Sequence, residues 1–326
     1  VYGLIIRALI LFQTYRRYQL GCRVISVGNI TFGGTGKTPL VESIARYLKQ
    51  KGCNIAILTR GYKRKRARDE KRRTRDEMMG DEPTMLSRNL GDVPVIVDAD
   101  RVRSAHRAIR EYGVKAVILD DGFQQWRIKK DLEIVAIDAT CPFGNGHMIP
   151  RGILREPLSS LRRADIFVLT KTNLTPDIQK IKDCLNLINP KAMVFESVHK
   201  PIGFYDITKP QELLNVDLLK GKTAALVSGI AAPESFEKLI KDLAICAGVS
   251  FRFPDHHNYQ AEDVEKMAAQ LRDKNIESII TTEKDAARMP YKAFPQAVKV
   301  FVLKIELQIT DNEKEFFSRI YSVCAG

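Results

Sequence analysis

The feature that most constrains the fold is an apolar strand that runs into a glycine-rich loop. Residues 24–38 read VISVGNITFGGTGKT, and the loop closes with Gly36, Lys37 and Thr38 before a segment of helical spacing at Pro39–Gln50. Glycines let backbone N–H groups turn toward an anion, the lysine reaches the β- and γ-phosphates of a nucleotide, and the threonine hydroxyl can ligate Mg²⁺. The following helix directs its positive N-terminal end at the same anion. The pattern predicts a phosphate-binding loop.

The loop departs from the general pattern G-x-x-x-x-G-K-[ST] at its first position. Thr31 stands where the pattern has glycine, and Gly33 and Gly34 supply the flexibility instead. The alternative is an ordinary strand–turn–helix with a chance Gly-Lys-Thr, which the combined order of strand, glycines and helix disfavours. The residues expected to bind a nucleotide are Gly33, Gly34, Thr35, Gly36, Lys37 and Thr38.

Apolar runs of strand length alternate with helical patterns along the chain, with helices expected at 233–247 and 261–274. The expected strands are 23–27, 55–58, 94–97, 116–119, 134–137, 166–169, 193–196, 224–227, 250–253, 279–282 and 299–303. This alternation predicts an α/β fold of the P-loop type, a mostly parallel sheet with helices on both faces. A stretch rich in Gly, Pro and Thr at 201–210 suggests a boundary. We therefore expect an N-terminal segment at 1–20, a P-loop domain at 21–203, and a smaller C-terminal α/β domain at 204–326 that closes the active-site cleft.

The chain is strongly basic, with a formal net charge of +13 and a pI near 9.4. This balance predicts an anionic partner, which could be nucleic acid, an acidic membrane face or a phosphorylated substrate. Ten Lys and Arg residues lie between Arg60 and Arg75, and stacking aromatic side chains do not alternate with them, so nucleic acid is disfavoured. The six cysteines have no C-x-x-C spacing, which argues against a zinc site or a disulfide framework and fits a reducing compartment.

Residues 1–20 form an amphipathic segment. Arg7, Arg16 and Arg17 interrupt it, so no run approaches the ~18 apolar residues that a spanning helix needs. Its apolar residues lie largely opposite a polar stripe, as in a helix that rests in a membrane interface with cations near anionic headgroups. A helix packed on its own domain is the alternative, and both stay open. A cleaved signal peptide is not expected, because no small-residue cleavage site follows.

An acidic pair follows another expected strand. The run AVIL at 116–119 leads into Asp120 and Asp121, and then into Gly122-Phe123-Gln124. Adjacent carboxylates are costly unless a cation lies between them, and phosphoryl transfer needs such a group to organise Mg²⁺. The alternative is a turn that happens to be acidic. We expect Asp120 and Asp121, together with Thr38, to hold the metal.

Three other polar clusters fall in loops. Gly80-Asp81-Glu82-Pro83 opens a helix, where Asp81 could serve simply as a cap. Arg101 follows a strand and could clamp a phosphate bidentately. His256, in the run DHHNY at 255–259, could pair with a carboxylate to prepare a proton acceptor, although such a histidine is more often structural.

Together these segments resemble the tetraacyldisaccharide 4'-kinase family of lipid A biosynthesis. The matching segments, in family order, are VGNITFGGTGKTP at 27–39, TRGY at 59–62, GDEP at 80–83, DR at 100–101, DDGFQ at 120–124, FGNG at 143–146, PRGILREP at 150–157, DHH at 255–257 and TTEKDAAR at 281–288. They extend from the phosphate loop nearly to the C-terminus. Thr31, odd for a general P-loop, is similar to what this family has.

The resemblance implies an enzyme that uses ATP and Mg²⁺ to phosphorylate the 4'-hydroxyl of a tetraacyldisaccharide 1-phosphate, a lipid A precursor. It implies a peripheral protein on the cytoplasmic face of the bacterial inner membrane. Its partners would then be this precursor and an anionic membrane surface, with no nucleic acid and no obligate protein partner.

The resemblance also implies roles for individual residues. Asp81 would be the general base for the sugar hydroxyl, with His256 as its dyad partner. The other implied positions are Lys37 and Arg101 for catalysis, Gln124 for the nucleotide, and Arg60, Tyr62, Glu82 and Glu156 for the substrate. One position departs from the pattern: Gln125 stands where the family often has His, so no imidazole role carries over there.

Two other function classes stay open. A P-loop GTPase or ATPase switch that delivers a metal or a partner protein would also have a phosphate loop and a strand-end Asp. GTPases usually show an N-K-x-D segment, whereas residues 170–173 read TKTN and lack that Asp. A non-enzymatic scaffold for a membrane surface or nucleic acid is favoured by the charge alone.

Overall fold

The computed structural model describes residues 6, 9–10, 12–13, 17–61 and 80–325. The chain divides into two compact units, one formed by residues 1–199 and 307–326 and the other by residues 200–306. Most of the expected N-terminal segment, Tyr62 and most of the basic stretch at 60–75 lie outside the described residues. In the part of the chain that is described, no helix combines the length and apolarity that crossing a membrane requires.

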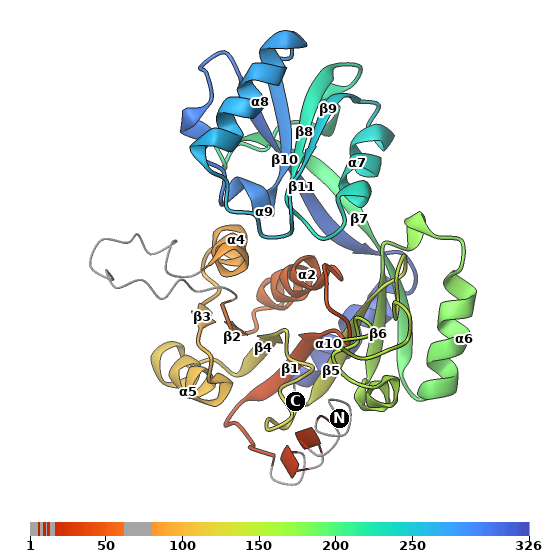
Figure 1. The fold of residues 1–326 in the computed structure, drawn as a ribbon. Helices are drawn as coiled ribbons and strands as arrows, with labels where there is room; N and C mark the ends of the chain where they lie inside the picture. Colours follow the sequence, from red (N-terminus) through yellow and green to blue (C-terminus); the bar gives the residue numbers. More distant parts are fainter. Residues whose placement is uncertain (1–5, 7–8, 11, 14–16, 62–79, 326) are drawn as a thin grey trace. The chain divides into compact units, whose positions relative to one another are not determined.

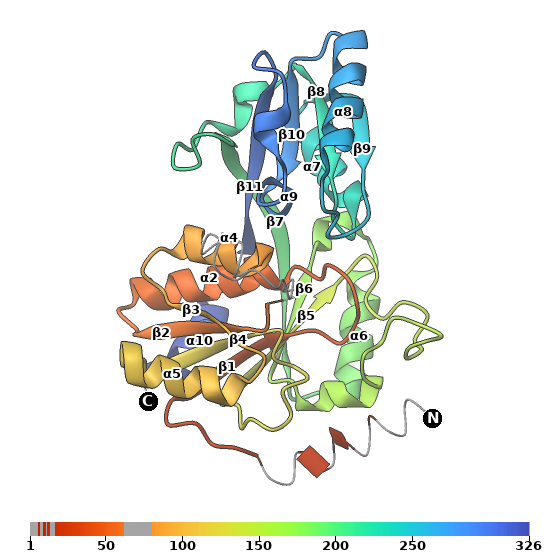
Figure 2. The ribbon, with the colours of Figure 1, turned by 60° about the vertical axis from the view of Figure 1, so that its left-hand side comes forward.

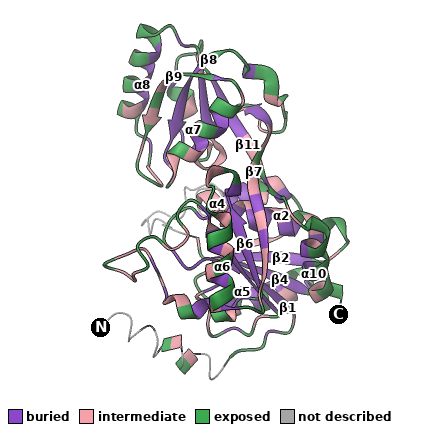
Figure 3. Cartoon of the chain, turned by 90° about the vertical axis from the view of Figure 1, so that its right-hand side faces the viewer, coloured by how far each residue is buried: buried purple, intermediate pink, exposed green. Residues whose placement is uncertain are grey.

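The larger unit is built on parallel strands in the order β3-β2-β4-β1-β5-β6-β7 (Figure 1). The strands are β1 (Arg23–Gly28), β2 (Ile55–Thr59), β3 (Val95–Val97), β4 (Ala116–Asp120), β5 (Leu132–Asp138), β6 (Ile166–Thr170) and β7 (Met193–Asp206), the last of which continues into the smaller unit. Figure 3 shows that the central strands are buried along their length. This burial explains why they read as nearly continuous apolar runs.

Helices cover both faces of this sheet, because successive strand residues point to opposite sides. Ile25 and Val27 of β1 pack with α2, α4 and α10, whereas Val24 packs with α5 on the other face, where α6 also lies. Figure 2 shows α2 and α5 on opposite sides of the strands. The helices are α2 (Lys37–Gln50), α4 (Asp81–Leu90), α5 (Arg101–Tyr112), α6 (Ile178–Ile188) and α10 (Glu313–Ala325).

The smaller unit repeats this layering. Its parallel strands follow the order β11-β10-β8-β9, with α7 packed against Ala224 and Leu226 and α8 packed on the opposite face against Ala225 and Val227. The elements are β8 (Thr223–Ser228), α7 (Pro233–Asp242), β9 (Cys246–Arg252), α8 (Ala261–Asp273), β10 (Ser278–Thr282), α9 (Glu283–Ala286) and β11 (Lys299–Ile309). The predicted fold class, a mostly parallel sheet with helices on both faces and a smaller C-terminal α/β domain, is confirmed.

The unit boundaries differ from the sequence-based expectation. The expected boundary near residue 203 falls inside β7, and residues 307–326, expected in the smaller domain, belong to the larger unit. The reason is the apolar side of α10, whose Phe316 and Ile320 are fully buried in the core that α2 helps to form. The helix expected to reach residue 247 ends at Asp242, because β9 already begins at Cys246.

Candidate functional site

The glycine-rich loop leaves β1 and enters α2. Gly33 and Gly36 have φ angles of 112° and 76°, in the left-handed region that side chains other than glycine rarely adopt. Gly36 is the N-cap of α2, and none of the described side chains caps this helix end. The first N–H groups of α2 are therefore left for an anion, as the sequence predicts for a phosphate loop.

The backbone around residue 154 explains the threonine at the head of the loop. Thr31 forms a bridge with Leu154, and the Arg155 N–H donates to the Ile30 carbonyl at 2.8 Å. Thr31 is 4% exposed, and its carbonyl also accepts a hydrogen bond from Asn29 Nδ2 at 2.6 Å. The residue that departs from the general pattern is thus paired and buried, and the glycine-rich part of the loop starts after it.

Side chains from the ends of β5 and β6 hold the loop by its carbonyl groups. Thr170 Oγ1 donates to the Thr35 carbonyl at 3.0 Å, and Lys171 Nζ donates to the Gly34 carbonyl at 3.2 Å. Lys171 is also paired with Asp138, so its charge is balanced. These contacts fix the loop conformation from the side of the sheet.

His199, near the middle of β7, limits what can occupy the loop. Its Nε2 lies 3.0 Å from the point that a Cβ on Gly36 would occupy. Burial, together with the charge of Lys171, lowers the pKa of His199 to about 4, against the opposing effect of Asp138. A neutral imidazole therefore packs against Gly36, and a larger residue there would require the imidazole to shift.

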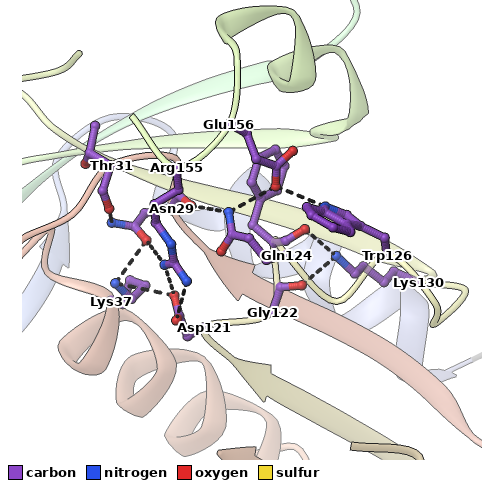
Figure 4. Close-up of polar contacts among 11 residues, drawn as sticks. Asn29, Thr31, Lys37, Asp121, Gly122, Gln124, Trp126, Lys130, Arg155 and Glu156 are labelled. Atoms are coloured by element: carbon purple, nitrogen blue, oxygen red, sulfur yellow. Dashed lines mark hydrogen bonds and ion pairs between the residues drawn. The ribbon is translucent and has the colours of Figure 1, made fainter. Parts of the chain in front are cut away.

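Lys37 lies at the centre of a polar cluster (Figure 4). Its Nζ donates to Asn29 Oδ1 at 3.1 Å and lies 3.6 Å from Asp121 Oδ1. Arg155 donates to both oxygens of Asp121, at 2.7 and 3.0 Å, and to Asn29 Oδ1 at 3.1 Å. Two cations thus converge beside the phosphate loop, as binding of a polyphosphate requires.

Asp121 is held as a carboxylate by these cations. Burial alone would raise its pKa, but the charges of Lys37 and Arg155 outweigh burial and lower the pKa to about 2. Because Arg155 binds both of its oxygens, Asp121 is engaged with protein cations in this structure. Its role as a metal ligand stays a prediction.

Asp120, one residue earlier, lies in the opposite environment. It is 3% exposed, and burial together with the charges of Glu82 and Asp121 raises its pKa to about 6, even though Lys37 acts in the other direction. A buried carboxylate that repels its neighbours is stabilised when a divalent cation binds between them. Asp120 is therefore the better placed of the two acids to hold a metal.

The donor set fits Mg²⁺ bound together with a nucleotide. Among the described residues, no three His, Cys, Asp or Glu side chains gather as a complete metal site. Mg²⁺ usually takes only one or two carboxylates from a protein and completes its octahedron with phosphate oxygens and water. Asp120 and the hydroxyl of Thr38, which is 4% exposed in the first turn of α2, would supply that share.

We expect Asp120→Asn to raise the free energy of unfolding at neutral pH by about 2–3 kcal/mol in metal-free buffer. The folded pKa of about 6 exceeds the ordinary value of 3.8, so this carboxyl contributes its full stability below about pH 4 and loses it as the pH rises through 6. The neutral amide avoids that loss. Thermal unfolding measured from pH 4 to pH 8 should show the melting temperature of Asp120→Asn rising relative to that of the parent protein as the pH rises.

Asp121→Asn is the matched control for this experiment. Its lowered pKa means that the carboxylate stabilises the fold above about pH 4, so the amide should destabilise the protein at neutral pH. An Asp120→Asn protein that is less stable than the parent at pH 7.5 would contradict the electrostatic assignment.

Arg101 is the first residue of α5 and is 2% exposed. Burial lowers its pKa, the charges of Asp120 and Asp121 oppose that effect, and the charge of Arg60 adds to it. Its Nη1 donates to the Asp98 carbonyl, and its buried Nε has no hydrogen-bond partner among the described residues. A buried guanidinium with a spare donor beside two carboxylates suits the binding of a phosphate.

Glu156 is a fully buried hub of hydrogen bonds (Figure 4). Its Oε1 accepts from Gln124 Nε2 at 3.1 Å and from Trp126 Nε1 at 3.0 Å, and its Oε2 accepts from Arg163 at 2.8 Å. Gln124 also donates to the Asn29 carbonyl at 3.1 Å, which ties the segment after β4 to the end of β1. The contacts of Glu156 are those of an internal support; the substrate role of Glu156 and the nucleotide role of Gln124 stay predictions.

The GDEP and DHH segments lie on different units. Asp81 and Glu82 are the first two residues of α4, and Glu82 is near enough to Asp120 to raise the pKa of that acid. His256 belongs to the smaller unit, where its backbone has a φ of 59° and its N–H donates to the Gly229 carbonyl at 3.1 Å. The pairing of Asp81 with His256 stays a prediction, and Tyr62 lies outside the described residues.

Sequence reasoning overlooked three side chains of this site. Asn29 is a polar residue at the end of an apolar strand, directly before the loop, and Arg155 immediately precedes Glu156 in PRGILREP. Lys171 follows the apolar run of β6 in TKTN. A polar residue that directly follows a buried strand was the signal in two of the three positions.

The sequence of the chain is similar to those of known proteins over most of its length. A family model described as tetraacyldisaccharide-1-P 4'-kinase matches residues 1–325. The tetraacyldisaccharide 4'-kinase of Halothermothrix orenii is 37% identical over 316 residues, covering 89% of this chain and 81% of the relative. The enzyme of the same name from Elusimicrobium minutum is 38% identical over 313 residues, with 92% and 82% covered.

A solved structure matches as well. The crystal structure of LpxK from Aquifex aeolicus in complex with ATP has a TM-score of 0.77 and 27% sequence identity, and the match covers 99% of this chain and 96% of that one. The fold thus agrees with a solved structure over nearly the whole length of the chain. The chain belongs to the tetraacyldisaccharide 4'-kinase family.

Proposed function

We propose that this chain is an ATP-dependent kinase that transfers the γ-phosphate of ATP to the 4'-hydroxyl of a tetraacyldisaccharide 1-phosphate, a lipid A precursor. The observation that carries the proposal is the convergence of Lys37 and Arg155 on Asp121 beside a phosphate loop whose conformation is already fixed. Family membership supplies the acceptor. The alternative, a GTPase or metal-delivery switch, draws support only from features that all P-loop proteins share.

Phosphoryl transfer needs a phosphate cradle, a metal and a positioned acceptor. The loop N–H groups and Lys37 bind the β- and γ-phosphates, and Arg101 adds a further positive charge. Thr38 and Asp120 would hold Mg²⁺, which when bound supplies charge that offsets the charge on the phosphates. Asp81 accepts the proton of the 4'-hydroxyl, and His256 supports Asp81 as its dyad partner.

We infer that the protein works as a peripheral protein on the cytoplasmic face of the bacterial inner membrane. Its acceptor carries acyl chains and phosphate, and the net charge of +13 favours an anionic surface. Phe12, 79% exposed, and Leu9, 40% exposed, are apolar side chains of the N-terminal segment that could enter the interface.

The activity can be tested directly. Detergent-solubilised protein incubated with ATP, Mg²⁺ and tetraacyldisaccharide 1-phosphate should form the bis-phosphorylated product, detected by mass spectrometry. A panel of lipid and sugar acceptors in parallel reactions defines the acceptor class. Folded protein that binds ATP but transfers no phosphate to this acceptor would refute the proposal.

A further inference from the structure

The segment TTEKDAAR at 281–288 has no role in the function proposed above. It spans the end of β10 and the short helix α9, which Figure 1 shows following one another in the smaller unit. Asp285 is fully buried there, and its Oδ1 accepts from Tyr259 Oη at 3.0 Å and from Arg288 Nη2 at 2.7 Å. Its Oδ2 accepts from Thr282 Oγ1 at 2.7 Å. A charge this deeply buried needs such partners, and removal of one would leave the other uncompensated.

Arg288 joins this carboxylate to the loop that carries His256. Its Nη1 donates to the His257 carbonyl at 3.2 Å, and its Nη2 donates to the Gly229 carbonyl at 3.2 Å. The Gly229 carbonyl also accepts the N–H of His256 at 3.1 Å. The guanidinium of Arg288 therefore holds the backbone of His257 directly. It also donates to the Gly229 carbonyl, which is the group that accepts the His256 N–H.

The anchoring matters because of the backbone at His256. Its φ of 59° is in the left-handed region, which is unfavourable for a non-glycine residue and persists only where surrounding contacts impose it. The hydrogen bonds to Gly229 and His257 are such contacts. Without them the chain would relax toward right-handed values, and the imidazole would change direction.

Tyr259 is the last residue of the loop at 255–259, which also carries His256. It is 5% exposed, and its ring packs edge-on against Phe253 and His257. Burial, together with the charge of Asp285, raises the pKa of Tyr259, so the phenol stays neutral and donates a hydrogen bond to Asp285. A Cβ added to Gly229 would lie 3.0 Å from Asp285 Oδ1 and 3.2 Å from Tyr259 Oη, so the network leaves little space beneath the loop.

We propose that Arg288 and Asp285 are positioning residues for His256, which act on phosphoryl transfer through the backbone of residues 255–259. The inference rests on the proposed function, in which His256 is the partner of the general base. A catalytic side chain displaced by about 1 Å can lose two orders of magnitude in rate. The contacts of this network described above involve no residue of the phosphate loop, so we expect ATP binding to be unchanged when the network is altered.

The first test is Arg288→Lys, which keeps the charge opposite Asp285 but loses the planar fork that reaches two carbonyl groups. We expect kcat to fall about tenfold or more while the KM for ATP stays within about twofold. Arg252→Lys is the matched control: Arg252 lies in the same unit and pairs with Glu234 at 3.0 Å and Glu237 at 2.7 Å, but its side chain is 49% exposed. It should keep the kcat of the parent.

A double-mutant cycle with His256→Ala separates positioning from stability. If Arg288 acts through His256, Arg288→Lys should cause no further loss in the His256→Ala protein. Tyr259→Phe, which removes a hydrogen bond and leaves the Asp285–Arg288 pair intact, should show a smaller loss with the same non-additivity, and it gives a second cycle if Arg288→Lys fails to fold.

The outcomes are distinguishable. Additive losses, or a fall in kcat matched by an equal loss of ATP affinity, would overturn the positioning role. An unchanged kcat for Arg288→Lys beside a slow His256→Ala protein would overturn it as well and leave the role of His256 intact. Parental kcat in His256→Ala would refute the dyad role of His256 and the positioning role of Arg288 and Asp285. The kinase activity itself is tested separately, by the assay of the parent protein with tetraacyldisaccharide 1-phosphate.

Discussion

Replacement of Lys37 by methionine is expected to lower kcat/KM for ATP about a thousandfold. The methionine keeps most of the apolar stem but removes the ammonium group, which Asn29 and Asp121 orient beside the phosphate loop. Charge that develops on the transferred phosphoryl group would then lose a cation that stabilises it. Steady-state kinetics at varied ATP, with a direct ATP-binding titration, would measure the loss.

Lys49→Met serves as the control for this substitution. Lys49 is on the same helix, but its side chain is 44% exposed, and its ammonium group pairs with Asp92 at 3.3 Å and donates to the Leu90 carbonyl at 3.1 Å. Its loss should leave kcat/KM near that of the parent. A Lys37→Met protein with parental kinetics would remove Lys37 from the phosphate site.

Asp81→Asn is expected to lower kcat by about a thousandfold with little change in the KM for ATP. The amide has the shape of the carboxylate and suits the first turn of α4, so the helix should persist. It cannot accept the proton of the sugar hydroxyl, and general-base catalysis is lost. Initial rates at saturating ATP and acceptor would show this, with ATP binding measured separately.

The matched control is Asp92→Asn, an acid-to-amide change just beyond the other end of α4 at a side chain that is 96% exposed. It should leave kcat unchanged. If Asp81→Asn retained the kcat of the parent protein, another group would have to be the base.

The larger sheet was predictable from sequence because each buried strand is a short apolar run between turn residues. β1, β2, β4 and β6 begin at the predicted residues. β7 is longer than its sequence predicts. The pattern predicts a strand only at 193–196, whereas the strand continues to Asp206 through Pro201 and Gly203. Those residues favour turns in isolation, and tertiary pairing overrides that preference.

The site was predictable to the extent that it follows strand ends. Lys37 and the Asp120–Asp121 pair follow parallel strands, whose carboxyl ends meet at one edge of a sheet. The difference in pKa between Asp120 and Asp121 could not be predicted from the sequence. The pKa of Asp120 is raised to about 6 by burial and by the charges of Glu82 and Asp121, whereas the charges of Lys37 and Arg155 lower the pKa of Asp121 to about 2. Arg155 lies 34 positions further along the chain, and no local pattern encodes its contact with Asp121.

The return of α10 to the larger unit has a consequence for how the protein is made. Phe316 and Ile320 complete a core that includes residues of β1 and α2, near the start of the chain. During synthesis that core lacks α10 until residues 307–326 have left the ribosome. The larger unit, although most of it is encoded first, is therefore completed last, after residues 200–306 of the smaller unit have emerged as one continuous segment.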